Sequence, residues 1–128
     1  MAVREFKELR VYQQAYEVAT RIVEHTKAWP KEETYLLTDQ IRRSSRSVCA
    51  NIAEAWRKRR YEKHFVSKLS DADAEAAETR TWVQFGRDCG YLSKESFEDL
   101  DSTYNHMMED PEPWCGPGTA REPSIAYD

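Results

Sequence analysis

The sequence predicts an all-α protein, an antiparallel up-down four-helix bundle with left-handed twist. Apolar residues recur at spacings of three and four in four separate stretches, as expected of helices that bury one face. The chain holds only 4 Gly and 5 Pro, and most of these lie after position 110. So few turn residues exclude most β-sandwiches and barrels. Four amphipathic helices joined by short links form a bundle by default.

The first helix is expected from about Phe6 to Lys27. It ends before Trp29-Pro30, because the residue preceding a proline is disfavoured in helical conformation. Three-four spacing defines its core-facing stripe as Phe6, Leu9, Tyr12, Ala15 or Tyr16, Ala19, Ile22, Val23 and Thr26.

The second helix is expected to begin between Lys31 and Leu36 and to reach about Arg57. Glu32 and Glu33 suit its N-terminus, where the helix dipole favours anions. Its apolar stripe takes in Ser44 and Ser45 and consists otherwise of Leu37, Ile41, Val48, Ile52 and Ala55. The opposite face of this helix combines small residues with cations: Arg42, Arg46, Ala50, Ala53 and Arg57. Small side chains allow another helix, another subunit or a polyanion to approach the backbone closely.

The third helix is expected from about Tyr61 to Asp88, with alternating four- and three-residue spacing typical of a left-handed bundle seam. Gly90 is a candidate C-terminal cap. Ser93 is expected to cap a fourth helix that ends before Pro111. The expected core comprises Leu37, Ile41, Val48, Ile52, Phe65, Leu69, Val83, Phe97 and Leu100.

The bundle is assigned to residues 1–110 and a flexible tail to residues 111–128, where Trp114 and Ile125 are candidates for local packing. No apolar run approaches the roughly 18 residues that span a bilayer, and the N-terminus has no apolar signal core. The three cysteines, Cys49, Cys89 and Cys115, are read as buried free thiols. A cytoplasmic protein is expected.

The net charge of −4 hides a strong asymmetry along the chain. Residues 40–68 are rich in Lys and Arg, whereas residues 69–128 are rich in Asp and Glu. The best functional candidate lies in this basic block and consists of Arg57, Lys58, Arg59, Arg60 and Lys63. Such cations neutralise phosphates, and the interleaved Trp56, Tyr61 and Phe65 suit base stacking. The alternative is a solvated helix end with core aromatics.

A second candidate cluster on the second helix combines Arg42, Arg43 and Arg46 with Asn51 and Glu54. Glu54 requires a partner from another helix or subunit, and Asn51 is expected to fix helix register through hydrogen bonds. A ligand-binding role is the alternative. The acids of the third helix form a solvated face or pair with a neighbouring subunit's basic block; they are Asp71, Asp73, Glu75 and Glu78.

No reaction chemistry is predicted. The Glu-x-x-His pattern of di-iron bundles is absent, so no metal or cofactor is expected. Nucleophile motifs and phosphate-cradling glycine loops are absent as well, which indicates a protein that is not an enzyme.

Several motifs, in this order, resemble a family of small bacterial four-helix-bundle proteins, the 23S rRNA intervening-sequence proteins. They are Phe6-Lys-Glu-Leu9, Trp29-Pro30-Lys-Glu-Glu33, Arg42-Arg43, Ser47-Val48, Asn51-Ile52-Ala53-Glu54, Glu78-Thr79-Arg80-Thr81 and Gly90-Tyr91-Leu92. The resemblance covers about residues 6–92. Three residues depart from the family pattern: Ala55 stands where the family usually has Gly, and Ala74 and Glu75 where it tends to have Gly and Ser.

The resemblance implies a left-handed bundle that assembles into rings, typically pentamers. It assigns structural or interface roles to Arg42, Arg43, Arg46, Asn51, Glu54 and Glu78. One similar group serves diversity-generating retroelements as an accessory protein that binds reverse transcriptase and RNA, an analogy at the level of fold. The expected function is a non-enzymatic homo-oligomeric scaffold with RNA or a protein as partner. The alternatives are a purely structural oligomer and a ligand- or metal-binding bundle enzyme.

Overall fold

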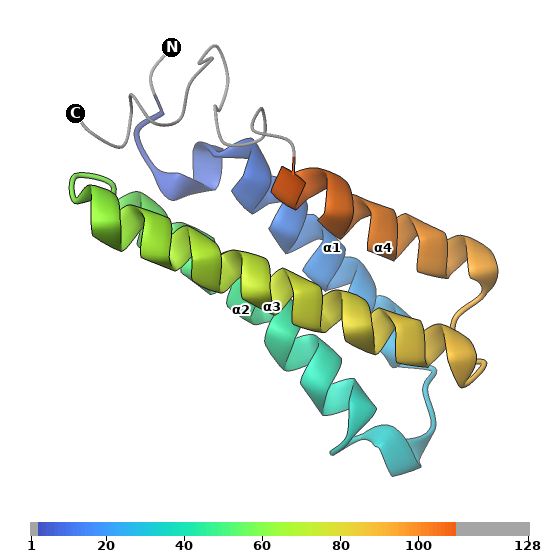
Figure 1. The fold of residues 1–128 in the computed structure, drawn as a ribbon. Coiled ribbons are helices and arrows are strands. Elements are labelled where there is room, and N and C mark those ends of the chain that lie inside the picture. The colour runs from blue at the N-terminus through green and yellow to red at the C-terminus, as the bar shows by residue number, and fades with distance from the viewer. Residues whose placement is uncertain (1–2, 110–128) are drawn as a thin grey trace.

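The structure, a computed structural model, describes residues 3–109 and contains four α-helices with two short 3-10 turns (Figure 1). Within these residues no strand occurs, and the predicted four-helix fold class is confirmed. The expected tail, with Trp114 and Ile125, lies outside the described residues. The elements are η1 (Phe6–Glu8), α1 (Arg10–Thr26), η2 (Lys31–Glu33), α2 (Leu37–Arg57), α3 (Glu62–Asp88) and α4 (Lys94–Glu109).

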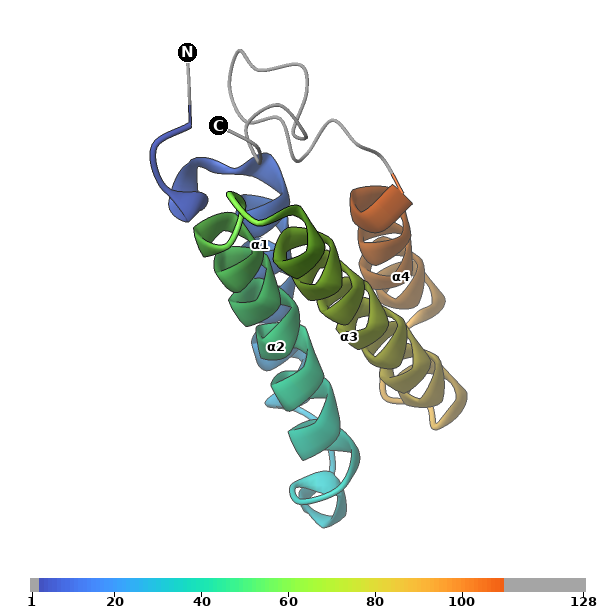
Figure 2. The ribbon, with the colours of Figure 1, turned by 60° about the vertical axis from the view of Figure 1, so that its left-hand side comes forward.

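The two long helices α2 and α3 lie side by side and run in opposite directions (Figures 1 and 2). Lys68 Nζ lies 2.7 Å from Glu54 Oε1 near one end of the pair. Towards the other end, the buried hydroxyl of Thr79 donates to Ser44 Oγ at 2.7 Å. Helix α1 packs on α2, and α4 packs on α3 and α1. The left-handed twist stays a prediction.

Two helices begin later than the sequence pattern suggested. Leu9 has extended backbone angles (φ −70°, ψ 131°) and separates η1 from α1, so the first helix starts at Arg10 and not at Phe6. The chain likewise forms η2 before α2 starts at Leu37. The predicted caps are confirmed: Gly90 adopts φ +81° after α3, and Ser93 Oγ accepts the Ser96 amide at 3.0 Å.

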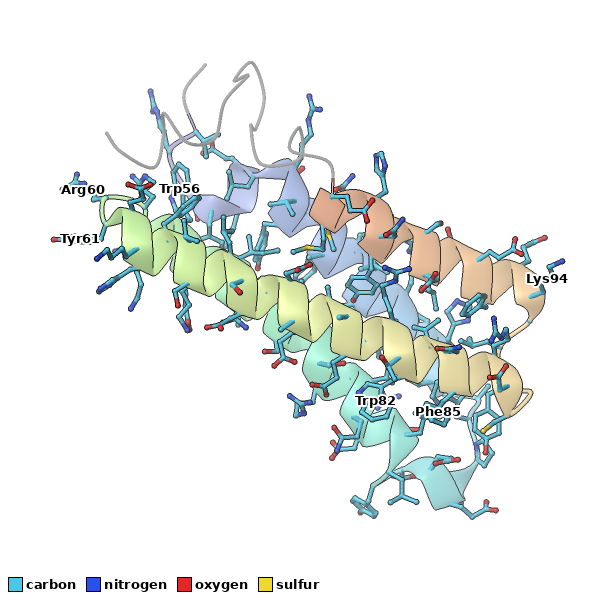
Figure 3. The ribbon with its side chains drawn as sticks, viewed as in Figure 1. Trp56, Arg60, Tyr61, Trp82, Phe85 and Lys94 are labelled. Carbon is cyan, nitrogen blue, oxygen red and sulfur yellow. The ribbon has the colours of Figure 1, made fainter. Side chains whose placement is uncertain are left out.

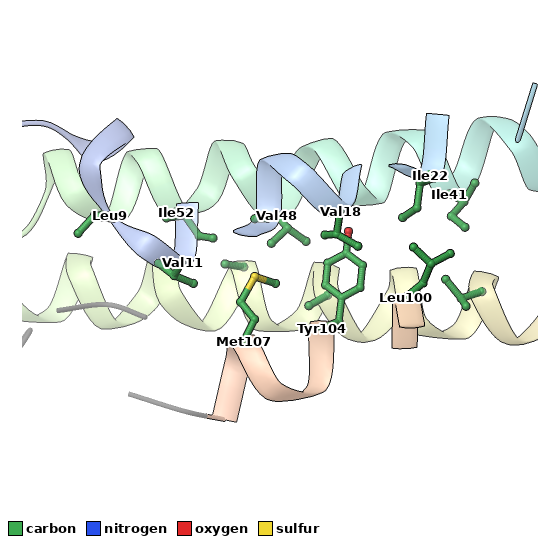
Figure 4. Close-up of a cluster of buried hydrophobic side chains, with 14 of the residues drawn as sticks. Leu9, Val11, Val18, Ile22, Ile41, Val48, Ile52, Leu100, Tyr104 and Met107 are labelled. Carbon is green, nitrogen blue, oxygen red and sulfur yellow. The ribbon is translucent and has the colours of Figure 1, made fainter. Parts of the chain in front are cut away.

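The core lies between the four helices and contains most of the expected residues (Figure 4). Leu37, Leu69 and Phe97 are only partly buried and pack against it. The remaining six of the predicted core are buried: Ile41, Val48, Ile52, Phe65, Val83 and Leu100.

The inward face of α1 overlaps the expected one and is shifted towards Val11 and Val18. Its buried stripe is Val11, Ala15, Val18 and Ile22, joined by Ala19 and Thr26. Tyr16 is 60% exposed, so Ala15 is the core residue of that pair. Val11 and Val18 obey the same helical spacing as the predicted stripe. Tyr16 is left outside, whereas Tyr12 is half-buried and packs against the core.

Within residues 3–109, no helix is both long enough and apolar enough to cross a membrane. Cys49 and Cys89 are free, and Cys115 lies outside the described residues. Burial raises the pKa of the half-buried Cys49 thiol to about 11. The expectation of a buried thiol is wrong for Cys89, which is exposed because it stands at the end of α3.

Candidate functional site

The five predicted phosphate-binding cations gather where α2 turns into α3; we call Arg57, Lys58, Arg59, Arg60 and Lys63 the basic corner. Helix α2 ends at Arg57, and the Tyr61 amide donates to the Lys58 carbonyl oxygen at 3.0 Å, which closes the turn. Four of the five side chains are exposed, and Arg59 is half-buried. Figure 3 shows Arg60 and Tyr61 at this end of the bundle.

Arg59 differs from its neighbours because its guanidinium is held against the bundle. It lies 3.9 Å from the centre of the Trp56 ring and donates to the Trp56 carbonyl oxygen at 2.9 Å. Trp56 is only 2% exposed, and Phe65 is buried beside Ala55. The prediction that Trp56 and Phe65 serve as stacking platforms is therefore wrong. Both rings are buried, as expected from the alternative in which the aromatics belong to the core.

Tyr61 is the aromatic residue of this corner that remains accessible. It is 67% exposed, and its ring centre lies 5.8 Å from that of His64. A base reaching the corner meets this ring, whereas Trp56 is covered.

Four cations of the basic corner have no Asp or Glu oxygen within 4.0 Å among residues 3–109. They are Arg57, Lys58, Arg60 and Lys63. The nearby Glu54 is bound instead to Lys68, and this bond is the main cause of the raised pKa of Lys68. Lys68 also lies 3.7 Å from Asp71. Among the described residues 3–109, nothing acidic therefore offsets the positive charge that these four cations present at the surface.

The second predicted cluster connects helices within the chain. Arg43 bonds Glu78 and lies 3.6 Å from Glu75, while Trp82 Nε1 donates to Glu78 Oε2 at 3.1 Å. Arg42 Nε donates to Thr26 Oγ1 at 2.8 Å and so ties α2 to α1. These contacts fix how the helices pack.

Glu54 has the partner from another helix that the sequence required, since it pairs with Lys68 of α3. Asn51 binds mainly its own helix, donating to the Ser47 carbonyl oxygen at 2.9 Å. Lys68 Nζ approaches its side-chain oxygen only at 3.5 Å. Its contribution to register is therefore weaker than expected. Arg46 is exposed on the same helix, on the face that also holds Ala50.

Part of the acidic run of α3 is used inside the chain. Glu75 and Glu78 face Arg43, and Asp71 faces Lys68. Asp73 is exposed. In the part of the chain that the structure describes, no three His, Cys, Asp or Glu side chains gather as metal ligands would.

The whole helical region matches one family model. The model is that of the 23S rRNA-intervening sequence protein, and it matches residues 7–110. The chain belongs to this family. The match extends through α4, beyond the residues up to Leu92 that carried the resemblance in the sequence.

A solved structure from the S23 ribosomal protein family supports the fold of this 23S rRNA-intervening sequence family member. That protein, from Bacteroides thetaiotaomicron and of unknown function, is 28% identical to this chain. The alignment covers 80% of this chain and 92% of the other, with a TM-score of 0.71. Among curated proteins none matches. Neither the family description nor the neighbour's indicates an enzyme.

The surface of this family member also has a groove that the sequence did not predict. The groove is a hollow of about 480 Å³ between η1, α1 and α2, and it is lined by Tyr12, Tyr16 and Arg46, among others. The sequence pattern placed Tyr12 on the core-facing stripe and left Tyr16 as the alternative to Ala15. The competing stripe through Val11 and Val18 was the sequence signal that Tyr16 faces outward.

Proposed function

We propose that the protein is a non-enzymatic homo-oligomeric scaffold, a pentamer, that binds RNA through the basic corner. The observation that carries the RNA part is the convergence of four exposed cations without carboxylate partners among residues 3–109, beside the exposed ring of Tyr61. Lysine and arginine bind phosphates and release counterions, whereas an exposed aromatic ring stacks on a base.

The oligomeric part rests on the family resemblance, which implies a ring of subunits. A ring repeats the basic corner on each subunit, and contacts that are modest singly then add up through multivalency. This offsets the acidic overall charge of the chain.

The test is fluorescence anisotropy with a short labelled RNA over a salt series. Engagement of these four cations predicts that log K falls with log salt with a slope of about −3. The double variant Lys58→Glu/Arg60→Glu is expected to bind more than about tenfold more weakly, because it reverses two contacts at the phosphates.

The matched control is Lys31→Glu/Lys94→Glu, which makes the same change of net charge at the other end of the bundle. Lys94 lies there, far from Arg60, in Figure 3, and both control lysines are exposed. Equal losses for both variants would mean that only net charge matters. A fall in assembly mass for the corner variant alone would show that the corner holds subunits together, which favours the purely structural oligomer.

A further inference from the structure

The groove between η1, α1 and α2 has an aromatic wall and a floor of small side chains. Phe6, Tyr12 and Tyr16 line it from η1 and α1, and Ala50 and Ala53 line it from α2. An adjoining hollow of about 650 Å³ shares Tyr12 and Tyr16. The two hollows together leave room for planar groups beside the rings.

The three rings follow one another in contact along the groove. The ring centres of Phe6 and Tyr12 lie 5.0 Å apart in an edge-to-face arrangement, and those of Tyr12 and Tyr16 lie 6.1 Å apart. Tyr16 closes this series and is well exposed, whereas Tyr12 is half-buried. The packing of the core does not require this exposed ring, because Ala15 and Val18 already fill the inward face of α1.

One cation, Arg46, lines the groove from α2, and a second, Arg57, stands further along the same helix face. Arg46, Ala50, Ala53 and Arg57 follow one another at spacings of four, three and four on α2, so they share one helix face. The two alanines floor the groove, Arg46 lines it and Arg57 belongs to the basic corner. The cationic face of the groove is therefore continuous with the proposed phosphate-binding surface.

The other charges near the groove leave this positive side open. Lys7 Nζ lies 6.0 Å from the centre of the Phe6 ring. Glu17, which lines the adjoining hollow, lies 3.8 Å from Arg21, and Arg21 also bonds Asp99. Arg46 has no Asp or Glu oxygen within 4.0 Å among residues 3–109.

We propose that this groove takes unstacked bases of single-stranded RNA, with Tyr16 as the main stacking ring and Arg46 on the adjacent phosphate. This inference rests on the proposed function and narrows its substrate class. A cationic groove with successive aromatic rings is the arrangement that binds single strands without strong sequence preference. Duplex RNA does not offer its bases in this way, because they are paired and stacked.

The test compares Tyr16→Ala with Tyr35→Ala in anisotropy titrations of a 12-nucleotide single strand and of a duplex of equal length. Tyr35 is the matched control, since it is 88% exposed and lies before α2 at the end away from the groove. Tyr16→Ala is expected to weaken single-strand binding about five- to hundredfold, the effect of losing one stacked base. Tyr16→Phe keeps the ring and is expected to retain binding, and Tyr35→Ala is expected to bind as the wild type does.

The outcomes separate this inference from the function on which it rests. If the basic-corner variant loses RNA and Tyr16→Ala does not, the groove assignment is wrong and the proposed function stands. If the wild type binds no RNA, the proposed function itself fails. Equal wild-type affinity for duplex and single strand overturns the inference. It is also overturned if Tyr16→Ala, but not Tyr35→Ala, lowers the assembly mass in light scattering, because the groove then holds a second copy of the chain.

Discussion

At the residue scale, a side-chain hydrogen bond ties Tyr91, which follows α3, to Glu33 of η2. The Tyr91 hydroxyl donates to Glu33 Oε2 at 2.9 Å, and its ring lies 5.4 Å from that of Trp29. The bond to the carboxylate, helped by burial, raises the pKa of Tyr91 to about 12 from an ordinary value of 10.0. The neutral phenol is thus the form that the fold favours.

This contact predicts a loss of stability in alkali. Because the folded pKa lies above the unfolded one, the stabilisation is complete below about pH 10 and disappears as the pH rises towards 12. Urea unfolding at several pH values should show the wild type more stable than Tyr91→Phe at pH 9. The difference should shrink between pH 10 and 12. A constant difference across this range would contradict the proposed bond.

At the element scale, the orientation of α1 decides which of its side chains stabilise the fold. Ile22 is fully buried and Tyr16 is mostly exposed. Replacing Ile22 with Ala should therefore lower the free energy of unfolding by about 2–5 kcal/mol through lost burial and the cavity left behind. Replacing Tyr16 with Ala should change it by no more than about 0.5 kcal/mol.

Denaturant unfolding of both variants checks this orientation. Similar losses for the two would mean that Tyr16 packs in the core, which was the alternative to Ala15 that the sequence pattern left open. An unchanged stability for Tyr16→Ala would also make its RNA-binding result interpretable, because the variant is then folded.

The helices could be read from the sequence because apolar spacing marks α2, α3 and α4, and because the caps at Gly90 and Ser93 mark the end of α3 and the start of α4. In α1 two overlapping stripes satisfy the same spacing, and the packing of α1 against α2 and α4 selects Val11 and Val18 over Tyr16. The sequence predicted the basic corner as a cluster of charges. It did not predict that Arg59 differs from its neighbours, because the stacking of Arg59 on Trp56 depends on how the turn folds.

At the scale of the whole molecule, some of the cations of residues 40–68 form ion pairs between helices, and others remain exposed at the surface. Arg43 and Lys68 bind acids of α3 and α2, which joins the two long helices. The four other cations of the basic corner have no such partner among residues 3–109, whereas Arg59 stacks on Trp56. Four cations gathered at one end of a bundle, with no carboxylate beside them in residues 3–109, suit a repeated, multivalent surface for a polyanion.

The central claim, an oligomer that binds RNA, is tested most directly by sedimentation velocity of the protein mixed with labelled RNA, followed at both the protein and the label wavelengths. A pentamer predicts a species of about 75 kDa, a multiple of the 15.0 kDa chain. The label should sediment with this species at low salt and separate from it at high salt. A 15.0 kDa protein sedimenting apart from the RNA at low salt would contradict both parts of the claim.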